Sequence, residues 1–282
     1  MSNNAIYFRR RMVNVINLGI SSLAMLFGLF WLAWILFTLL KNGFSAIHLS
    51  VFTQMTPPPG SEGGLANAIV GSVLIVLFST LIGTPIGIMA GIYLAEYGDH
   101  GKLAAPTRFI NDILLATPSI LIGMFIWTTY VNQVKHFSGW AGSFALALIV
   151  IPVVVRTTEN MLRLVPNSMR EAAYALGTPR WKVVSAVTLR ASKAGVLTGV
   201  MLAVSRIAGE TAPVLFTALN NQFFSANMNA PMASLPAVIY QFANNPDKIW
   251  NELAWASALI MTFAVLVLNI VARVLVKREQ HH

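Results

Sequence analysis

The chain lacks cysteine and is poor in charged residues. Among its 282 residues there is no Cys, and Asp, Glu, Lys and Arg together make up 10%. Without Cys there is no disulfide framework and no thiolate chemistry, so cysteine usage says nothing about the redox compartment. The hydrophobic share of 56% is far too high for one soluble core of this length. This composition predicts an integral membrane protein.

Motifs for ATP hydrolysis and metal binding are also missing. The phosphate-loop pattern GxxxxGK[ST] does not occur, and GDHGK at residues 98–102 lacks both its spacing and the following Ser or Thr. The histidines show no paired-ligand spacing for a metal, being isolated at His48, His100 and His136 or terminal at His281 and His282. We therefore expect a protein that is not an enzyme and binds no metal or other cofactor itself.

Six apolar runs are long enough to cross a bilayer, at about residues 18–40, 67–95, 109–131, 141–163, 196–219 and 254–276. The first follows Arg9, Arg10 and Arg11, as in a signal peptide. It is longer than a signal-peptide core, however, and no small-residue cleavage site follows it. The sequence thus predicts an all-α polytopic membrane protein with six transmembrane helices, the first an uncleaved anchor.

Lys and Arg are distributed unevenly between these spans. Only Lys41, Lys135 and Lys248 fall on one side, and the other Lys and Arg residues, apart from Arg206 within the fifth span, fall on the opposite side. The positive-inside rule then places both termini in the cytoplasm. Because this asymmetry also accounts for the net charge of +9, no nucleic-acid partner is needed to explain it.

Small residues recur every four positions in two spans, and so line one helix face. They are Ser79, Gly83, Gly87, Gly91 and Ala95 in the second span, and Ala191, Gly195, Gly199 and Ala203 in the fifth. Small residues let helix backbones approach closely in lipid, so we expect tight packing at these faces rather than a ligand role.

Prolines are expected to interrupt four spans, at Pro85, Pro118, Pro152 and Pro213. Carbonyl groups freed by such breaks must be satisfied by neighbouring helices or by a water-filled cavity. The prolines therefore suggest a pathway through the bundle without locating it.

Two charged residues are expected in the middle of the fifth span. Arg206 and Glu210 stand one turn apart on the same helical face. Because Arg at the bilayer centre costs about 2.5–3.5 kcal/mol, both side chains should face the bundle interior. They form either a structural ion pair, although Arg before Glu is the weaker order, or an anion site in which the guanidinium fork suits phosphate. Thr211 adjoins them as a further candidate pathway residue.

A second polar cluster is predicted toward the cytoplasmic end of the fourth span. It comprises Arg156, Thr157, Thr158 and Glu159. Two roles for Arg156 are equally open, a second stop on the pathway and a positive-inside anchor. Glu159 is the other candidate pathway residue of this cluster.

A basic stretch at residues 168–195 separates the fourth and fifth spans and reads as two short helices. Ser168 and Glu171 have capping-box spacing, and Gly177 provides a helix stop. Thr178 would then cap a second helix with Pro179 at its first position. From these caps alone, a plain connecting hairpin and a docking element are equally good interpretations.

The same stretch resembles the EAA loop of ABC-transporter permeases. Glu171, Ala172, Ala173, Gly177 and Leu189 match its pattern, with Val187 in place of the usual Ile and Arg190 in place of the usual Pro. The resemblance implies a coupling helix that docks on a separate ATPase subunit, and Arg180 is included among the expected coupling residues.

Further blocks resemble the PstA-type permease subunits of phosphate ABC transporters. They are MTPPPGSEGGLANAIVGS, ATPSILIG, RTTENMLRLVPNSMREAAYALG, RIAGETAP and MASLPAVIY, in order along the chain. The resemblance implies a type I importer (MetI-like) fold in the bacterial inner membrane. It divides the chain into a tail, peripheral helix and first periplasmic loop at 1–64 and a five-helix core at 65–282, with the coupling loop at 164–195.

The resemblance also implies partners and a mechanism. The expected partners in the bilayer are a homologous second permease (PstC-type), two ATPase subunits (PstB-type) that carry ATP and Mg, and a periplasmic or extracellular phosphate-binding protein (PstS-type). The implied function is phosphate import by alternating access. One alternative is an ABC permease for phosphonate, sulfate or molybdate. The other is a stand-alone secondary transporter or channel, although the expected internal repeat is not evident.

Overall fold

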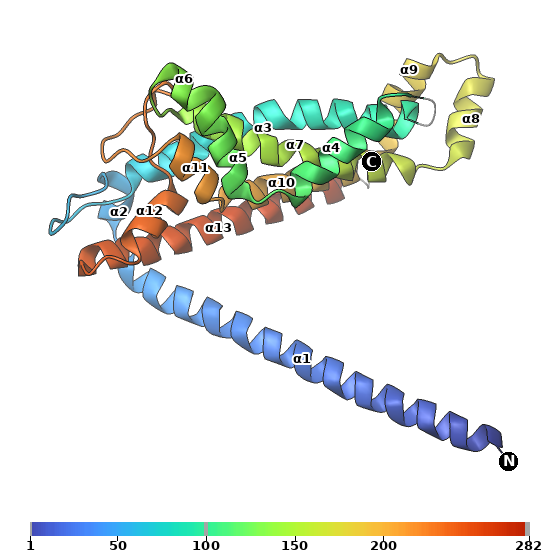
Figure 1. Cartoon of the computed structure of the whole chain (residues 1–282), viewed down its shortest axis with the longest axis horizontal. Helices are drawn as coiled ribbons and strands as arrows, with labels where there is room; N and C mark the ends of the chain where they lie inside the picture. Colours follow the sequence, from blue (N-terminus) through green and yellow to red (C-terminus); the bar gives the residue numbers. More distant parts are fainter. Residues whose placement is uncertain (1, 99–100, 280–282) are drawn as a thin grey trace.

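The computed structural model describes residues 2–98 and 101–279, and within them the chain forms helices and irregular segments without a strand (Figure 1). The helices are α1 (Ser2–Ala46), α2 (Leu49–Thr53), α3 (Ala66–Ile92), η1 (Tyr93–Tyr97), α4 (Ala104–Ala116), α5 (Ser119–Ile126), η2 (Trp127–Val131), α6 (Asn132–Val134), α7 (Gly139–Arg163), α8 (Asn167–Ala175), α9 (Arg180–Val183), η3 (Val184–Thr188), α10 (Leu189–Ala208), α11 (Ala212–Thr217), α12 (Leu235–Phe242) and α13 (Lys248–Glu279). The three η segments are π-helical turns that continue or join α-helices.

The predicted six-span, all-α architecture is confirmed. Among the described residues, five helical stretches are long and apolar enough to cross a membrane by themselves. The pair formed by Ala104–Ala116 and Ser119–Val134, which is bent by 106°, supplies the sixth span when its two helices are counted as one. The third predicted span is therefore a broken helix rather than a straight one.

The centre of the bundle is the contact between α3 and α7, and the small-residue stripe of α3 makes it possible. A Cβ atom added at Gly83 would lie 2.8 Å from the Val150 Cβ, and one at Gly87 would lie 2.7 Å from the Val154 Cβ. Both Val150 and Val154 are fully buried. The predicted close packing of this face is confirmed, because no side chain larger than hydrogen fits there without displacing α7.

The corresponding stripe of α10 packs on another part of α7. Gly195 lies directly against Met161, and Gly199 against Thr157. Ala203, one turn further along, is fully buried. Helix α7 is thus held between two small-residue faces, and its most apolar window is 67% buried.

The four prolines behave in two ways. Pro118 lies at the 106° bend between α4 and α5, and Pro213 lies in the first turn of α11, just after a break. Pro85 and Pro152, by contrast, lie inside helices that continue through them, so the prediction that they interrupt their spans is wrong. Both are in the tightly packed α3–α7 pair, where a neighbouring helix can hold the two halves in line despite a missing N–H.

Helix α1 leaves the bundle at one end and runs away from it (Figure 1). Only 6% of its most apolar window is buried in this chain. Its contact with α13 lies near its own C-terminus, where a Cβ at Gly43 would meet the Leu259 Cβ at 2.7 Å and the Phe44 and Phe263 rings lie 6.1 Å apart. This placement agrees with a peripheral first span, while the domain division at residue 64 stays a prediction.

The Pro- and Gly-rich segment before α3 is non-helical, as its composition predicts. It is only partly a surface loop. Pro58, Pro59 and Gly60 are exposed, whereas Pro57 is buried and its carbonyl oxygen accepts a hydrogen bond of 3.2 Å from the Trp250 indole N–H. The segment is therefore fastened to the start of α13.

Candidate substrate pathway and coupling site

The predicted fifth span is broken where its charged residues lie. Helix α10 ends at Ala208, Gly209 follows as its C-cap, and Thr211 is the N-cap of α11. Glu210 therefore lies in the break between the two helices. The prediction that it shares a helical face with Arg206 is wrong. Pro213 lies in the first turn of the next helix, where a missing N–H costs nothing.

Arg206 and Glu210 form a loose charge pair. The Arg206 Nε and the Glu210 Oε1 are 3.9 Å apart, beyond hydrogen-bond distance. The Glu210 side chain is 18% exposed and lines a cavity of about 10 Å³ with Ser72 and Ser234. The Arg206 side chain is 45% exposed, so the prediction that both residues face the interior of the bundle is wrong for Arg206. It lies on the outer surface of this chain.

A second broken helix supports this break. A Cβ at Gly123 of α5 would lie 2.7 Å from the Pro213 Cα, so α5 and α11 touch backbone to backbone. Helix α5 itself begins directly after the Pro118 bend. Irregular backbone at membrane depth is tolerated where it is buried in protein or lines a water-filled cavity, so this junction is a candidate pathway.

The second predicted cluster is divided by the fold. Arg156 lies 3.8 Å from Asp112 of α4, and both side chains are more than half exposed. Glu159 is buried and contacts the Arg108 Nε at 2.9 Å and the Arg163 Nη2 at 3.0 Å. Among the described residues, Arg156 and Glu159 thus have different partners. Arg108 and Arg163 both contact the Glu159 Oε1, and the contact with Arg108 fastens α4 to α7.

The two threonines of that cluster are turned into the bundle. The Thr157 hydroxyl donates to the Val153 carbonyl oxygen at 2.9 Å, within its own helix. The Thr158 Oγ1 is buried and has no hydrogen-bond partner among the described residues. Neither places a polar group beside Arg156.

The basic stretch between spans forms the predicted helical hairpin, α8 and α9 (Figure 1). Its caps differ from the prediction. Pro166 precedes α8 and Pro179 precedes α9 as N-cap, with no side-chain capping bond at either position, so the Ser168 and Glu171 capping box and the Thr178 cap are wrong. Pro166 and Pro179 both have an extended backbone conformation, with ψ of 140° and 149°, so each separates its helix from the residues before it. Gly177 has φ +73°, which confirms the predicted stop.

The outer surface of the hairpin is available to a partner. Glu171 and Ala172 are exposed, Leu176 is 85% exposed, and a Cβ at Gly177 would meet nothing within 4 Å. Trp181 is 66% exposed in the second arm. Exposed large apolar side chains next to a carboxylate are features of a docking surface.

Arg180 points away from that surface. Its guanidinium carbon lies 4.4 Å from the centroid of the Tyr97 ring, and its Nη2 donates to the Glu96 carbonyl oxygen. The same region contains Glu96, Arg108 and Arg170, which the sequence-based interpretation counted only as span-flanking residues or omitted. Glu96 is a single acidic residue at the end of an apolar span. That sequence feature could have indicated that arginines such as Arg108 and Arg170 gather there.

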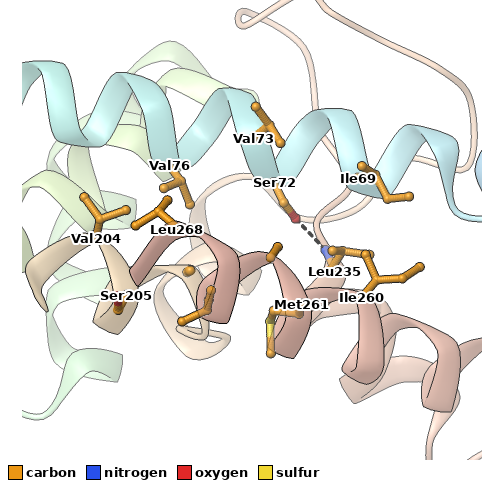
Figure 2. A pocket seen from close by; sticks show the side chains of 13 residues that line it. Ile69, Ser72, Val73, Val76, Val204, Ser205, Leu235, Ile260, Met261 and Leu268 are labelled. Atoms are coloured by element: carbon orange, nitrogen blue, oxygen red, sulfur yellow. Dashed lines mark hydrogen bonds between the residues drawn. The ribbon is translucent and has the colours of Figure 1, made fainter. Parts of the chain in front are cut away.

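A larger cavity lies elsewhere and is apolar. It has a volume of about 160 Å³ between α3, α10 and α13, and its lining includes Val73, Val76, Val204 and Leu268 (Figure 2). The hydrogen bond drawn there runs from the Leu235 N–H to the Ser72 Oγ at 2.7 Å. No charged side chain lines this cavity, so it does not offer an anion site.

Comparisons with known proteins assign the chain to a family. Residues 83–280 match the family described as "Binding-protein-dependent transport system inner membrane component". A relative from Pasteurella multocida (strain Pm70) is 60% identical over 272 residues, covering 96% of this chain and 97% of its own length. One from Yersinia pestis is 59% identical over 273 residues, covering 96% and 92%. Both are named "Phosphate transport system permease protein PstA".

A solved structure shows the same fold. A chain of the MetNI methionine ABC transporter in an inward-facing conformation superposes with a TM-score of 0.65 at 17% identity, covering 76% of this chain and 95% of that one. With several apolar helices, the chain is a multi-pass inner-membrane component of a transporter and not an enzyme. The chain belongs to the family of binding-protein-dependent transport system inner membrane components, among its PstA-type permeases.

Proposed function

We propose that this chain forms one half of the phosphate pathway of an ABC importer. The other half is a homologous second permease. Two ATPase subunits supply ATP hydrolysis with Mg, and an external binding protein delivers phosphate. The names of relatives 60% and 59% identical over nearly the whole chain support phosphate as the substrate.

The observation that carries the proposal is the position of Arg206. Its guanidinium is 45% exposed on the outer surface of this chain, beside the break between α10 and α11. An Arg facing lipid at the bilayer centre costs about 2.5–3.5 kcal/mol. A second permease packed over this surface, with a water-filled path between the two, removes that cost.

The local geometry suits a transient anion. A guanidinium offers a planar fork of donors that matches two phosphate oxygens. The nearest carboxylate, Glu210, is 3.9 Å from the Arg206 Nε and does not occupy the fork by a hydrogen bond. Glu210 weakens anion binding by its negative charge, so phosphate can leave as well as arrive. Thr211 adds a hydroxyl at the same break.

Arg156 is the proposed second cation on this route. Its side chain is 52% exposed and its contact with Asp112 is 3.8 Å long, so a passing anion can compete for it. Glu159 is less suited to the pathway, because its carboxylate is buried between Arg108 and Arg163. We assign it a supporting role.

The hairpin is the proposed site of ATPase docking. Glu171, Ala172, Ala173 and Gly177 occupy one accessible arm, with Leu176 projecting from its end. The excess of Lys and Arg on this side of the spans supports a cytoplasmic position for the hairpin and both termini. ATP-driven movement of the hairpin would then alternate access at the α10–α11 break.

A permease for phosphonate, sulfate or molybdate would use the same guanidinium chemistry, and the names of the relatives favour phosphate over these. A transporter acting alone is disfavoured by membership in a family of binding-protein-dependent components. The test must therefore address both the anion and the role of the charge pair.

The deciding experiment compares variants of the pair in membranes that contain the whole complex at equal amounts. Arg206→Lys keeps the charge but loses the fork, so radiolabelled phosphate uptake should fall about tenfold or more. Arg206→Gln should do at least as much harm. Arg206→Gln with Glu210→Gln removes both charges, and we expect a complex that assembles but does not transport.

Recovery of near wild-type uptake in the double variant would show that the pair is only structural, because an uncompensated charge is then the sole defect of the single variant. Sulfate and molybdate, offered as unlabelled competitors, separate the substrate classes. Competition by either at concentrations equal to phosphate would contradict phosphate as the preferred anion.

A further inference from the structure

Three arginines from three different elements converge on η1, the π-helical segment Tyr93–Tyr97 that ends α3. Arg108 of α4 donates to the Leu94 carbonyl oxygen at 3.1 Å, Arg170 of α8 binds the Glu96 carboxylate, and Arg180 of α9 binds the Glu96 carbonyl oxygen. Single π-helical turns occur often at functional sites. This one is where the hairpin meets the transport core.

Arg170 makes the most extensive of these contacts. Its Nη2 lies 2.9 Å from the Glu96 Oε1, and its Nε lies 3.2 Å from the same atom. On its other side, Nη2 donates to the Leu162 carbonyl oxygen at 2.8 Å and Nη1 to the Val165 carbonyl oxygen at 2.6 Å. Leu162 is in the last turn of α7, where helix carbonyl groups lack partners, and Val165 follows the C-cap Leu164. One side chain of α8 therefore joins the ends of α3 and α7.

This pair is shielded from water. The exposed fractions are 14% for the Arg170 side chain and 4% for that of Glu96. Arg180 fastens the second arm of the hairpin to the same place, since it also lies over the Tyr97 ring. Both arms thus hold adjacent residues of η1, although they are separated from it by 74 and 84 positions in the sequence.

We infer that Glu96 and Arg170 are positioning residues that transmit movement of the hairpin to α3 and α7. The inference rests on the proposed function. Buried ion pairs contribute little net stability compared with apolar replacements, but they require one mutual orientation. Because α3 and α7 are locked together by their glycine stripe, a displacement passed to their ends moves both helices as one unit toward the Arg206 region.

Arg170→Lys is the principal test, made in the full complex in liposomes. Lysine keeps the charge opposite Glu96, but one ammonium cannot also serve two carbonyl oxygens and a bidentate carboxylate. We expect ATPase co-purification to stay within about twofold of wild type, while phosphate uptake per ATP hydrolysed falls about tenfold, the value of one charge-assisted hydrogen bond. Glu96→Gln should give the same pattern with a smaller change of side-chain shape.

The control is Arg11→Lys, because Arg11 is exposed on the peripheral α1 and makes no hydrogen bond or ion pair with the described residues. It should leave uptake per ATP unchanged. Normal uptake per ATP in both Arg170→Lys and Glu96→Gln would overturn the inference. So would a loss of ATPase co-purification that parallels the loss of uptake, since the pair would then serve docking or folding alone.

The double variant Glu96→Leu with Arg170→Met separates positioning from stability. Apolar side chains of similar volume can restore the thermal midpoint, yet they do not impose one orientation. We expect a stable complex that hydrolyses ATP without uptake, and full uptake in this variant would contradict transmission by the ion pair. If the wild-type complex prefers another oxyanion, the proposed function fails, while the ratio measured with that oxyanion still decides the inference.

Discussion

The two ends of the helical bundle are held together by different chemistry. The hairpin end, which carries α8 and α9, relies on two buried carboxylates, Glu96 and Glu159, each in contact with an arginine from another element. The loop end, which carries residues 54–65 and 220–233, relies mainly on neutral amides and backbone groups. Figure 1 shows the hairpin and the loops at opposite ends of α3 and α7.

Asn67 is the clearest neutral counterpart. Its side chain is buried, its Oδ1 accepts a hydrogen bond of 3.0 Å from the Thr56 N–H, and its Nδ2 donates to the Asn221 carbonyl oxygen at 2.7 Å. One amide thus joins two loop segments to the start of α3. Nearby, the Trp250 ring stacks on Phe242 with centroids 4.1 Å apart.

The contrast bears on movement. An amide that satisfies buried backbone groups costs free energy if it is displaced, and it responds little to salt. At the hairpin end, the contacts of Arg108 and Arg163 with Glu159 reach water and weaken with ionic strength. The shielded Glu96 and Arg170 pair, by contrast, keeps one orientation while its two helices move. The loop end is therefore built to hold a fixed arrangement, and the hairpin end to pass on a displacement.

The largest effect on stability should follow from removing Glu159. Glu159→Leu leaves Arg108 and Arg163 without their shared carboxylate, and because these arginines are 32% and 49% exposed we expect the lower end of the usual cost, about 3 kcal/mol. The thermal midpoint of the purified complex at low and high salt measures this. The wild-type midpoint should fall toward that of the variant at high salt, and a salt-independent difference would contradict an ionic contribution.

Asn67→Leu should have a smaller effect, about 2 kcal/mol, because it leaves the buried Thr56 N–H and Asn221 carbonyl oxygen without their partner. The difference in thermal midpoint should be the same at low and high salt. Asn229→Leu, at the same loop end but at an exposed position, is the control. A strong salt dependence of the Asn67 effect would abolish the proposed distinction between the two ends.

Much of the helical architecture could be predicted because it depends on local patterns. Apolar length indicated the spans, and a spacing of four residues placed Gly83 and Gly87 on one face, where α7 packs. Pro85 and Pro152 were misjudged because a proline inside a helix is tolerated when a neighbour supports the helix. That support is a tertiary effect.

The site was predicted less completely for the same reason. Arg206 was recognised from its cost in lipid, yet its outward position depends on where α10 ends, and the apolar run continues past that point. The contact between Glu96 and Arg170 joins residues 74 positions apart, and no local pattern indicates it. The N-caps Pro166 and Pro179 were missed because the capping-box spacing indicated other residues as caps. In the structure the helices begin directly after the two prolines.

The smallest expected effect concerns a carboxylate at the loop end, that of Asp247. Asp247 accepts a hydrogen bond of 2.6 Å from the Gly60 N–H, and this bond, followed by those from Trp250 and Ile249, lowers the pKa of Asp247 below its usual 3.8. A carboxyl group with a lowered pKa in the folded state adds stability that is complete above 3.8 and is lost as pH falls through the folded value.

Protection of the Gly60 amide from hydrogen exchange measures this contribution directly. In the wild type, protection should stay constant from about pH 6 to the usual pKa and then decrease, because protonation removes the acceptor charge. Asp247→Asn should lower protection at pH 6 and abolish the decrease. Glu62→Gln, at an exposed position in the same loop, should behave as the wild type does. If protection of the Gly60 amide in the wild type did not depend on pH, the Asp247 charge would contribute nothing at the loop end. The expected decrease would show that this exposed contact makes an ionic contribution there.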